Sequence, residues 1–308
     1  MHAAKKYTKK AIRQDWRRNW ALYTLMIPVI LFYIGFCYKP MYGAIIAFKD
    51  YDPALGILGS DWIGLENFID FFQSSDFVRV FRNTIKISVL NIIFGFPAPI
   101  ILALLINELT KKKFAKTVQT ITYMPHFISL VVVCGLIKDF VSDSGVITSI
   151  LGMFGFPQVN MLQEPNMFVP IYIISGIWQE IGWGSIIYLA ALAGVDQELY
   201  EAASIDGAGR LRQTWSVTLP GIMPTIITMF ILKLGTIMNV GFEKIILLYD
   251  PITYETADVI SSFVYRKGIV DSDYGFSTAV GLFNSVINFA LIMISNTISR
   301  KVNDTSLW

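Results

Sequence analysis

The chain has 308 residues, of which 54% are hydrophobic and only 16% are charged, with a formal net charge of +2. Soluble domains carry roughly 25% charged residues, so this composition indicates a membrane protein and excludes a large water-soluble core. The small net charge argues against a nucleic-acid partner, which would need a clustered basic surface.

Two cysteines, Cys37 and Cys134, lie far apart inside apolar runs. Thiols in such positions are usually small buried hydrophobic side chains. Their spacing fits neither a redox pair nor a metal site, which leaves a lone catalytic thiol as the alternative.

Six apolar stretches are long enough to cross about 30 Å of hydrocarbon, which takes roughly 20 helical residues. They are residues 20–38, 84–106, 118–140, 168–193, 221–248 and 277–299. A basic segment precedes the first stretch and no small-residue cleavage pattern follows it, so we interpret this stretch as an uncleaved signal anchor. The sequence therefore predicts an all-α, polytopic membrane protein with six transmembrane helices. Its basic amino-terminal segment, 1–19, is followed by a single membrane domain, 20–308.

Basic residues predict the orientation, because lysine and arginine are enriched in cytoplasmic segments of membrane proteins. With alternating spans, fifteen basic residues fall on the side of the amino terminus and five on the other side. We therefore expect both termini and the 194–220 loop to be cytoplasmic. The opposite loops, 40–80, 142–167 and 249–276, are long and irregular. These loops could be simple connectors between spans, or they could form a docking surface for an extracytoplasmic protein.

Six prolines interrupt the predicted spans. Each removes one backbone donor from a membrane helix, so neighbouring groups must satisfy the freed carbonyl. These breaks either shape helix packing or line a path through the membrane and let helices rock. They are Pro28, Pro97, Pro99, Pro125, Pro170 and Pro224.

A polar segment, 201–220, separates the fourth and fifth spans. Residues 196–204 can form a short helix, and Gly207 and Gly209 allow a sharp change of direction. Residues 211–217 can form a second short segment that ends at a Leu-Pro pair. An ordinary amphipathic connector is the alternative to such an elbow. The side chains expected to anchor the elbow to the membrane helices are Trp215, Val217, Leu219 and Pro220.

The same segment resembles the EAA loop of ABC importer permeases. In that pattern the letters EAA are followed by three residues, a glycine, nine residues and Ile-x-Leu-Pro. Every spacing is kept here, and valine replaces the isoleucine. The matching residues are Glu201, Ala202, Ala203, Gly207, Val217, Leu219 and Pro220. The chain therefore resembles the permeases of binding-protein-dependent, maltose-type transport systems.

This resemblance implies the type I ABC importer permease fold, in which the elbow is a coupling helix that contacts an ATP-binding subunit. The coupling residues that it implies are Glu201, Ala202, Ala203, Asp206, Gly207, Ala208, Arg210 and Arg212. It also implies three kinds of protein partner. These are a second homologous permease subunit that forms a heterodimer, two ATP-binding subunits and an extracytoplasmic solute-binding protein.

Other stretches resemble the permeases that import oligosaccharides and polysaccharide fragments. They are residues 38–43, 62–68, 94–99, 123–126, 178–183 and 304–308. The resemblance implies a carbohydrate importer in the cytoplasmic membrane of a bacterium. It implies alternating access, driven by ATP, to a path between the two permease subunits.

The chain contains no G-x-x-x-x-G-K-[ST] phosphate loop. We therefore expect a separate subunit to bind ATP and magnesium, and no cofactor, metal ion or catalytic residue in this chain. A membrane-embedded glycan-modifying enzyme would need paired carboxylates, a metal site or an activated nucleophile. His2 and His126 are the only histidines, and the acidic residues of the outer loops are scattered.

Ionisable groups inside membrane spans are costly and are candidates for function. Glu180 and Lys233 lie at similar depths in consecutive spans, so we expect an ion pair that is structural or meets solute. Aromatic and amide groups around Glu180 could bind a sugar or pack against lipid. Asn239 and Glu243 would share one face of the fifth span, unless they mark a solvated helix end. The candidate path residues are Trp178, Gln179, Glu180, Trp183, Tyr188, Lys233, Asn239, Glu243 and Lys244.

Two further polar residues lie inside spans. We expect His126 to be buried and satisfied, with a pH sensor or a ligand as the alternatives, and Asn91 to form a hydrogen bond between helices. The alternative function is an ion-gradient-driven secondary transporter, with Glu180, Lys233 and Glu243 as its relay. Such a carrier has no use for an EAA loop, which favours the ATP-driven importer.

Overall fold

The structure is a computed structural model that describes residues 9–303, and these residues are almost entirely helical. Part of the basic amino-terminal segment and the 304–308 stretch lie outside the described residues. The helices are α1 (Lys9–Phe32), α2 (Lys39–Met41), α3 (Gly56–Gly59), α4 (Glu66–Gln73), α5 (Ser75–Leu90), α6 (Pro97–Asn107), α7 (Lys112–Tyr123), α8 (Leu130–Phe140), α9 (Val146–Met153), α10 (Pro165–Leu192), α11 (Gln197–Ile205), α12 (Arg210–Gln213), α13 (Leu219–Leu234), α14 (Phe242–Leu248), α15 (Tyr254–Ala257), α16 (Ile260–Tyr265) and α17 (Tyr274–Asn303). Short 3₁₀ or π segments are η1 (Tyr33–Tyr38), η2 (Tyr42–Phe48), η3 (Asn91–Gly95), η4 (Met124–Phe127), η5 (Met161–Gln163), η6 (Thr214–Thr218), η7 (Pro251–Thr253) and η8 (Arg266–Val270).

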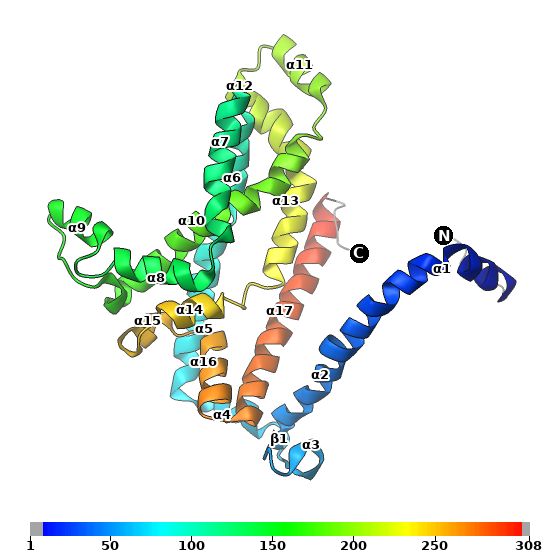
Figure 1. Cartoon of the computed structure of the whole chain (residues 1–308), viewed down its shortest axis with the longest axis vertical. Coiled ribbons are helices and arrows are strands. Elements are labelled where there is room, and N and C mark those ends of the chain that lie inside the picture. Colours follow the sequence, from blue (N-terminus) through cyan, green and yellow to red (C-terminus); the bar gives the residue numbers. More distant parts are fainter. Residues whose placement is uncertain (1–8, 304–308) are drawn as a thin grey trace.

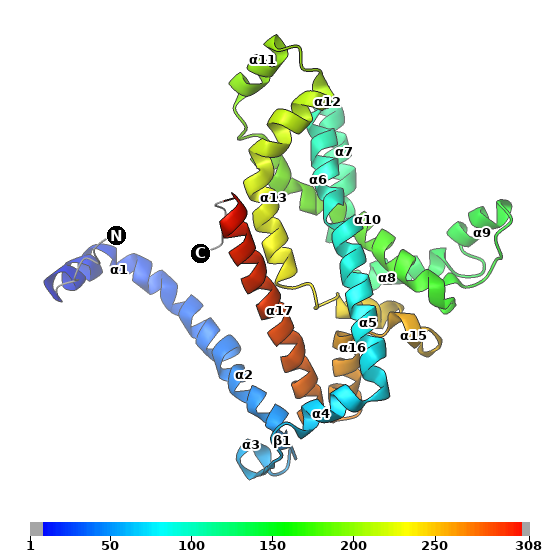
Figure 2. The same ribbon diagram turned by 180° about the vertical axis from the view of Figure 1, so that it is seen from behind.

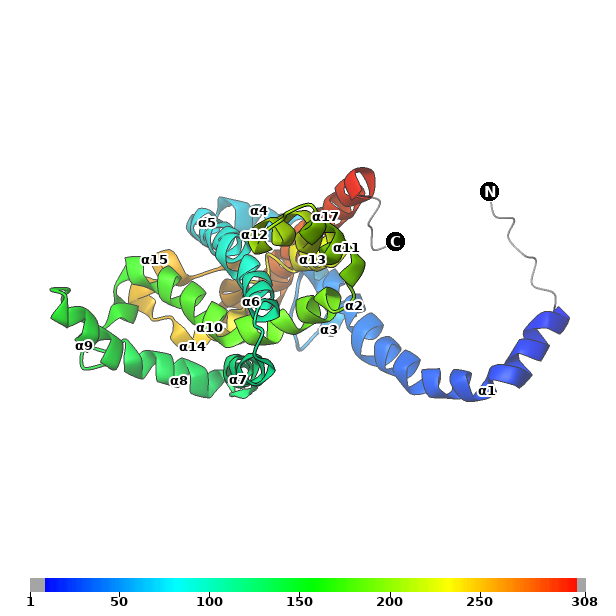
Figure 3. The ribbon, with the colours of Figure 1, turned by 90° about the horizontal axis from the view of Figure 1, so that it is seen from above.

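Helices α5, α6, α7, α13 and α17 lie roughly along the long axis of the molecule, whereas α10 crosses them obliquely (Figures 1 and 2). One end carries α3, α4 and a two-stranded ribbon of β1 (Lys49–Asp50) and β2 (Asp61–Trp62), and we call it the ribbon end. The other end carries α11 and α12, and we call it the elbow end. Helix α1 diverges from the other long helices (Figure 3), and the apolar window of its span is 0% buried by this chain.

Four helices of the described chain are long and apolar enough to cross a membrane. They are Asp15–Phe48, Ser75–Asn107, Arg210–Leu234 and Tyr274–Lys301. A bent pair, Lys112–Phe127 with Leu130–Phe140, would be a fifth span. Helix α10 corresponds to the predicted fourth span and is not among them. The predicted count of six spans is therefore not confirmed.

The second span stays continuous through its two prolines. The π turn η3 comes directly before α6, and the backbone N–H of Phe96 donates to the carbonyl of Asn91 at 2.9 Å. Pro97 and Pro99 follow inside this continuous span, and the π turn just before them accommodates the backbone donors that they lack. These prolines shift the helical register and do not break the span.

The third predicted span, 118–140, is wrong as a single straight helix. The chain bends by 99° between Lys112–Phe127 and Leu130–Phe140. Pro125 lies in the 3₁₀ turn η4, and Ile128 has an extended backbone (φ −80°, ψ 134°) that cannot continue a helix. Ser129 then begins α8, where its carbonyl accepts the N–H of Val133 at 2.9 Å.

The fifth predicted span, 221–248, is also wrong as one helix, because α13 ends at Leu234 and α14 begins at Phe242. Side chains of other helices satisfy the irregular segment between them. The Ser88 hydroxyl donates to the carbonyl of Ile237 at 2.7 Å, and Asn288 Oδ1 accepts the N–H of Met238 at 3.0 Å. Such compensation is what non-helical backbone requires at membrane depth.

The ribbon end is more ordered than the irregular loop predicted for residues 40–80. Its strands pair Lys49 with Trp62 in antiparallel register. The buried amide of Asn67 donates to the carbonyls of Ala47 and Lys49 at 3.0 and 3.2 Å, which ties α4 to the ribbon. Beside it, the buried Phe71 packs against a group of phenylalanines. They are Phe72, Phe77, Phe263, Phe276 and Phe283.

Helices α7 and α10 approach each other most closely at Gly182. A Cβ atom at this position would lie 2.0 Å from the backbone oxygen of Thr122. Backbone cannot move aside as the end of a side chain can, so this crossing requires glycine.

We expect Gly182→Ala to force α7 away from α10 and to lower the free energy of unfolding by about 1–3 kcal/mol, as overpacking does. Thermal unfolding of the purified transporter would measure the change. Gly176→Ala is the matched control on the same helix. A Cβ atom at Gly176 would lie 3.5 Å from Nζ of Lys244, which is an ordinary contact distance. Equal unfolding of the two variants would contradict the close approach.

Candidate functional sites

The elbow begins with a capped helix and a left-handed turn. The Asp196 carboxylate accepts the N–H of Glu198 at 3.0 Å and begins α11, which confirms the first predicted arm. At its end, the N–H of Ala208 donates to the carbonyl of Ala203 at 2.9 Å. Between them Gly207 has φ +76°, a conformation that favours glycine.

The second arm of the elbow differs from the prediction. Helix α12 continues through the π turn η6 into α13, so a single helix extends from Arg210 to Leu234. Pro220 does not end it, because the π turn η6 lies directly before α13 and accommodates the missing N–H of this proline within the continuous helix. The second arm is therefore the beginning of a membrane helix and not a separate segment.

Side-chain hydrogen bonds hold the two arms together. The amide of Gln213 donates to the Ser204 hydroxyl at 3.0 Å and to the carbonyl of Ala208 at 2.9 Å. The hydroxyl of Tyr200 donates to that of Thr218 at 3.0 Å. Because these bonds join α11 to the base of α13, the elbow can move as one unit.

The outer surface of the elbow is exposed. Within residues 9–303, no ion pair involves Glu201, Asp206, Arg210 or Arg212. All four side chains are exposed, as are Ala202 and Gly207, whereas Ala203 and Ala208 are half-buried. The charged members of the predicted coupling set are thus exposed and form no ion pair in the described part of this chain.

Three large apolar side chains share this surface: Ile205 is 87% exposed, Leu211 81% and Trp215 74%. The predicted anchoring role of Trp215 is therefore wrong within this chain, although Val217 does pack against the apolar cluster at the elbow end. Exposed apolar side chains with a polar rim mark interaction surfaces. The sequence analysis did not name Ile205 and Leu211 as candidates. They could have been recognised as large apolar residues within the polar segment 201–220.

Glu180 does not pair with Lys233, which corrects the expected ion pair. Its carboxylate lies 3.0 Å from Nδ1 of His126, and the imidazole stacks on the indole of Trp183 at 4.5 Å between ring centroids. His126 follows Thr122 by one helical turn, and Thr122 is where α7 crosses α10 at Gly182, so the packing of α7 brings His126 to α10. Lys233 and Lys244 remain within electrostatic range of Glu180.

The predicted cluster around Glu180 divides among different faces of α10, so it is not one site. Gln179 and Tyr188 are buried, whereas Trp178 and Trp183 are about half exposed. Consecutive helical residues differ by 100° in direction, so Trp178, Gln179 and Glu180 cannot face one solute together. Glu180 and Trp183 are exposed, and His126, which was expected to be buried, is half-buried beside them; these three side chains form the group that could meet solute.

The break in the fifth span separates Asn239 from Glu243, so they do not share a helix face as predicted. The side-chain oxygen of Asn239 accepts from Asn284 and Asn288 at 2.8 and 3.2 Å. Glu243 is exposed at the first turn of α14. A small cavity of about 50 Å³ beside the break is lined by Ser88, Asn91, Lys233, Thr236 and Asn239, among others. It is large enough for ordered water.

Lys244 is buried against the first half of α10. Its ammonium donates to the carbonyl of Tyr172 at 3.3 Å and lies 5.2 Å from the centre of the Tyr172 ring. Lys86, on α5, is exposed and was missed. This lysine could have been recognised from the sequence, because it lies in the apolar stretch 84–106 and a charged side chain inside a membrane span is costly.

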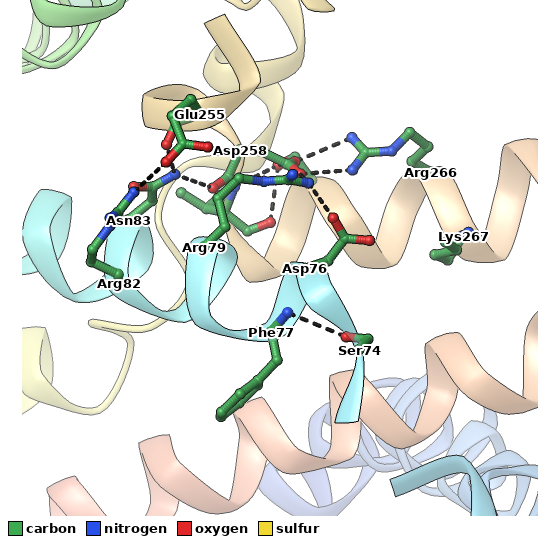
Figure 4. Close-up of polar contacts among 12 residues, drawn as sticks. Ser74, Asp76, Phe77, Arg79, Arg82, Asn83, Glu255, Asp258, Arg266 and Lys267 are labelled. Atoms are coloured by element: carbon green, nitrogen blue, oxygen red, sulfur yellow. Dashed lines mark hydrogen bonds and ion pairs between the residues drawn. The ribbon is translucent and has the colours of Figure 1, made fainter. Parts of the chain in front are cut away.

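A cluster of charges joins α5 to α15 and α16 (Figure 4). Asp258 is fully buried, and its carboxylate accepts hydrogen bonds from Arg266 at 2.7 and 3.2 Å and from Arg79 at 3.4 Å. Burial alone lowers the pKa of the Arg266 guanidinium, but the hydrogen bonds and charge of Asp258 outweigh it and raise that pKa above its ordinary value. Asn83 adds bonds to the carbonyls of Glu255 and Asp258.

Neither these sites nor the rest of the described chain gathers three metal-ligating side chains. The structure thus has two kinds of candidate site. The elbow is exposed and lies outside the apolar segments of the helices, and a set of polar side chains lies within those segments. This arrangement suits movement of a polar solute under the control of a partner protein.

Comparison with known proteins agrees with this geometry. Residues 73–304 match the family described as the binding-protein-dependent transport system inner membrane component. LplB of Bacillus subtilis strain 168 is 44% identical over 293 residues, covering 95% of this chain and 92% of that protein. The polygalacturonan/rhamnogalacturonan transport system permease protein YteP of the same strain is 42% identical over 288 residues, covering 93% and 90%.

Solved structures show the same fold. A chain of a bacterial ABC transporter involved in the import of the acidic polysaccharide alginate is 45% identical, with a TM-score of 0.87 over 95% of this chain and 99% of that chain. A second structure, of a bacterial alginate ABC transporter in complex with an alginate pentasaccharide-bound periplasmic protein, matches with a TM-score of 0.88. The predicted all-α, type I ABC importer permease fold is confirmed. The chain belongs to the inner membrane components of binding-protein-dependent transport systems, as an ABC importer permease.

Proposed function

We propose that the chain is one permease subunit of an ATP-driven importer for acidic oligosaccharides. The observation that carries this proposal is the elbow, which presents charged and apolar side chains that nothing in the described chain covers. An ATP-binding subunit on the cytoplasmic side is its proposed partner. This orientation places both termini in the cytoplasm and the ribbon end outside.

A continuous helix could carry a movement of the ATP-binding subunit from the elbow to the polar groups within the membrane helices. The helix that begins at Arg210 includes Lys233, 23 residues further on, which is about 35 Å at 1.5 Å per residue. Movement of the elbow would therefore be carried to the break at the end of α13. Two copies of the ATP-binding subunit would bind ATP and magnesium, and a second, homologous permease would complete the path.

The nature of the solute is inferred from the cations and from the relatives. Lys233 and Lys244 lie in or under the membrane helices near Glu180, and the relatives named above include permeases for polygalacturonan and alginate. Uronate units carry one carboxylate each, which lysine can bind as a point charge. A solute-binding protein outside the cell would deliver the oligosaccharide.

Cross-linking would test the assignment of the elbow. Ala203→Cys, in a chain whose exposed Cys37 is replaced by serine, should form a disulfide or a short cross-link with the ATP-binding subunit. Leu58→Cys is the matched control, because this residue is 90% exposed on α3 at the ribbon end. Equal cross-linking of the two positions, or none at Ala203 during active uptake, would contradict the proposal.

Replacement of Lys233 tests the solute. We expect Lys233→Met to lower ATP-driven uptake of alginate oligosaccharides or oligogalacturonates about tenfold or more, the effect of losing a hydrogen bond to a charged group. Lys233→Arg should retain part of the uptake, and Lys113→Met, in the first turn of α7, should leave it unchanged. Uptake of acidic oligosaccharides at the normal rate by Lys233→Met would exclude this lysine from the path.

A further inference from the structure

The first helix bends just before its apolar part. Helix α1 begins at Lys9, but Asn19 has φ −115° and ψ 18°, which interrupts the regular helix. Figure 1 shows the dark blue first turns of α1 directed away from the rest of the helix. Residues 9–18 are mostly charged or polar, so they lie outside the hydrocarbon core. The bend therefore lies where the span leaves the membrane.

The charges before this bend are almost all positive. The chain before Asn19 contains seven lysines and arginines and one acidic residue, Asp15. The Asp15 carboxylate accepts hydrogen bonds across the bend, from the side-chain amide of Asn19 at 2.7 Å and from the hydroxyl of Tyr23. Among the side chains that the structure describes, Asp15, Arg17 and Arg18 form no ion pair. Both arginines are exposed, so these positive charges need a partner outside the described chain.

Aromatic side chains at the bend give an independent sign of a membrane surface. Trp16 and Trp20 are 57% and 61% exposed, and the rings of Trp16 and Tyr23 stack with 4.9 Å between their centroids. Spacings of four and three residues place the three rings on one face of the helix, on both sides of the bend. Tryptophan and tyrosine are enriched where hydrocarbon meets the headgroups. Arg18 lies about 200° around the helix from Trp16, so a basic face opposes the aromatic one.

The place of this segment favours lipid over a protein partner. In Figures 1 and 2 the start of α1 lies level with the carboxyl end of α17, whose last turn carries Arg300 and Lys301, and the elbow extends beyond both. A subunit that covers the elbow would thus lie further from the membrane than this segment does. Basic residues beside a span attract anionic lipids when they lie within a Debye length of the headgroups.

We propose that residues 9–19 lie on the inner leaflet and bind the headgroups of anionic phospholipids. Arg17 and Arg18 bind the lipid phosphates, and Trp16 and Trp20 lie at the boundary between headgroups and hydrocarbon. This contact holds the cytoplasmic end of a span whose apolar window is 0% buried by the described chain. The inference rests on the proposed orientation, with the amino terminus in the cytoplasm, and not on the proposed solute.

A fluorescent probe before the bend tests this contact in the assembled transporter. Gln14→Cys would carry the probe, in a chain whose exposed Cys37 is replaced by serine and with companion subunits that lack exposed cysteines. In nanodiscs, phosphatidylcholine with a spin label in its headgroup would quench the probe. We expect phosphatidylglycerol to increase the quenching and salt to reverse it. Arg17→Gln together with Arg18→Gln should lower the ratio of quenched to unquenched probe about 25-fold, about fivefold for each arginine.

Lys112→Gln together with Lys113→Gln is the matched control, because it removes two charges from the first turn of α7 and should leave the quenching unchanged. Quenching that is independent of phosphatidylglycerol, or that falls equally in the control, would overturn the proposal. A probe shielded in every lipid mixture would also overturn it, because a protein would then cover the segment. The orientation is checked separately with a membrane-impermeant thiol reagent. Reaction of the unlabelled Gln14→Cys variant only from the outer side would refute the proposed orientation itself.

A second variant tests the bend without a change of charge. Asn19→Leu removes the hydrogen bond to Asp15 and favours a continuous helix, so the quenching should fall toward its value without phosphatidylglycerol. Ala21→Leu, two residues further along α1, is the matched control and should be quenched as the unaltered protein is. Full quenching in the Asn19→Leu variant would show that the bend does not place this segment on the membrane.

Discussion

Gly207→Val is expected to abolish ATP-driven uptake while leaving the transporter assembled. Gly207 has φ +76°, and a β-branched residue held in that region costs about 1–3 kcal/mol. The elbow would escape this strain by turning α11 away from α12 and breaking the bonds that Gln213 makes to Ser204 and Ala208. A partner protein would then meet a surface of the wrong shape. We expect uptake to fall at least tenfold and Gly207→Ala to have a smaller effect.

Gly209 provides the matched control for this experiment. It lies two residues further along and has φ −71°, which any residue adopts. Nothing within 4 Å would meet a Cβ atom at either glycine, so steric contact does not distinguish them within this chain. Gly209→Ala should therefore transport normally. Uptake and ATP hydrolysis in proteoliposomes would be measured for both, with assembly checked by gel filtration. Normal uptake by Gly207→Val would show that the left-handed turn is not needed for coupling.

The largest expected effect on stability is that of Asp258→Ala. The change would remove the buried carboxylate that binds Arg266 and Arg79, and leave their cations without this partner. Breaking a buried ion pair on one side costs about 3–5 kcal/mol. Since Arg79 is on α5 and Arg266 begins η8, we expect α16 to separate from α5 and the ribbon end to unfold first.

Glu255→Gln is the matched control for Asp258→Ala. Glu255 pairs with Arg82 at 2.7 Å in the same region, but both side chains are more than half exposed. Exposed pairs contribute about 0–1 kcal/mol, so this variant should unfold almost as the unaltered protein does. Unfolding of the purified transporter by increasing amounts of SDS, followed by tryptophan fluorescence, would compare them. A similar loss in the two variants would refute the special role of the buried carboxylate.

The elbow was predictable because its geometry depends on local chemistry. An aspartate before a helix, a glycine at a left-handed position and a fixed spacing are all visible in the sequence. Asp196 caps α11 and Gly207 makes the turn, as expected. The error was Pro220, which was expected to end the second arm. A proline can also be accommodated inside a helix beside a π turn, and only the structure distinguishes the two cases.

The polar groups in the membrane were predicted less well, for two reasons. The contact between His126 and Glu180 joins residues 54 positions apart, and it depends on how α7 packs against α10, which no local pattern determines. The division of Trp178 and Gln179 between faces of α10, by contrast, follows from helical periodicity and could have been predicted.

The charge cluster shows the limit of reasoning from sequence. Arg79 and Asp258 are 179 positions apart, and both lie in or near segments expected to be loops or loop ends. No local pattern predicts that they meet. Their contact follows from packing of α5 against α15 and α16, which the apolar pattern alone does not determine.

The bare apolar side chains of the elbow also bear on how a cell must produce this subunit. Ile205, Leu211 and Trp215 are exposed to water whenever no other protein covers them. A surplus of this chain over its companions would then be sticky and open to capture by chaperones and proteases. Balanced supply of all the subunits is therefore a requirement that is built into this one short stretch of sequence.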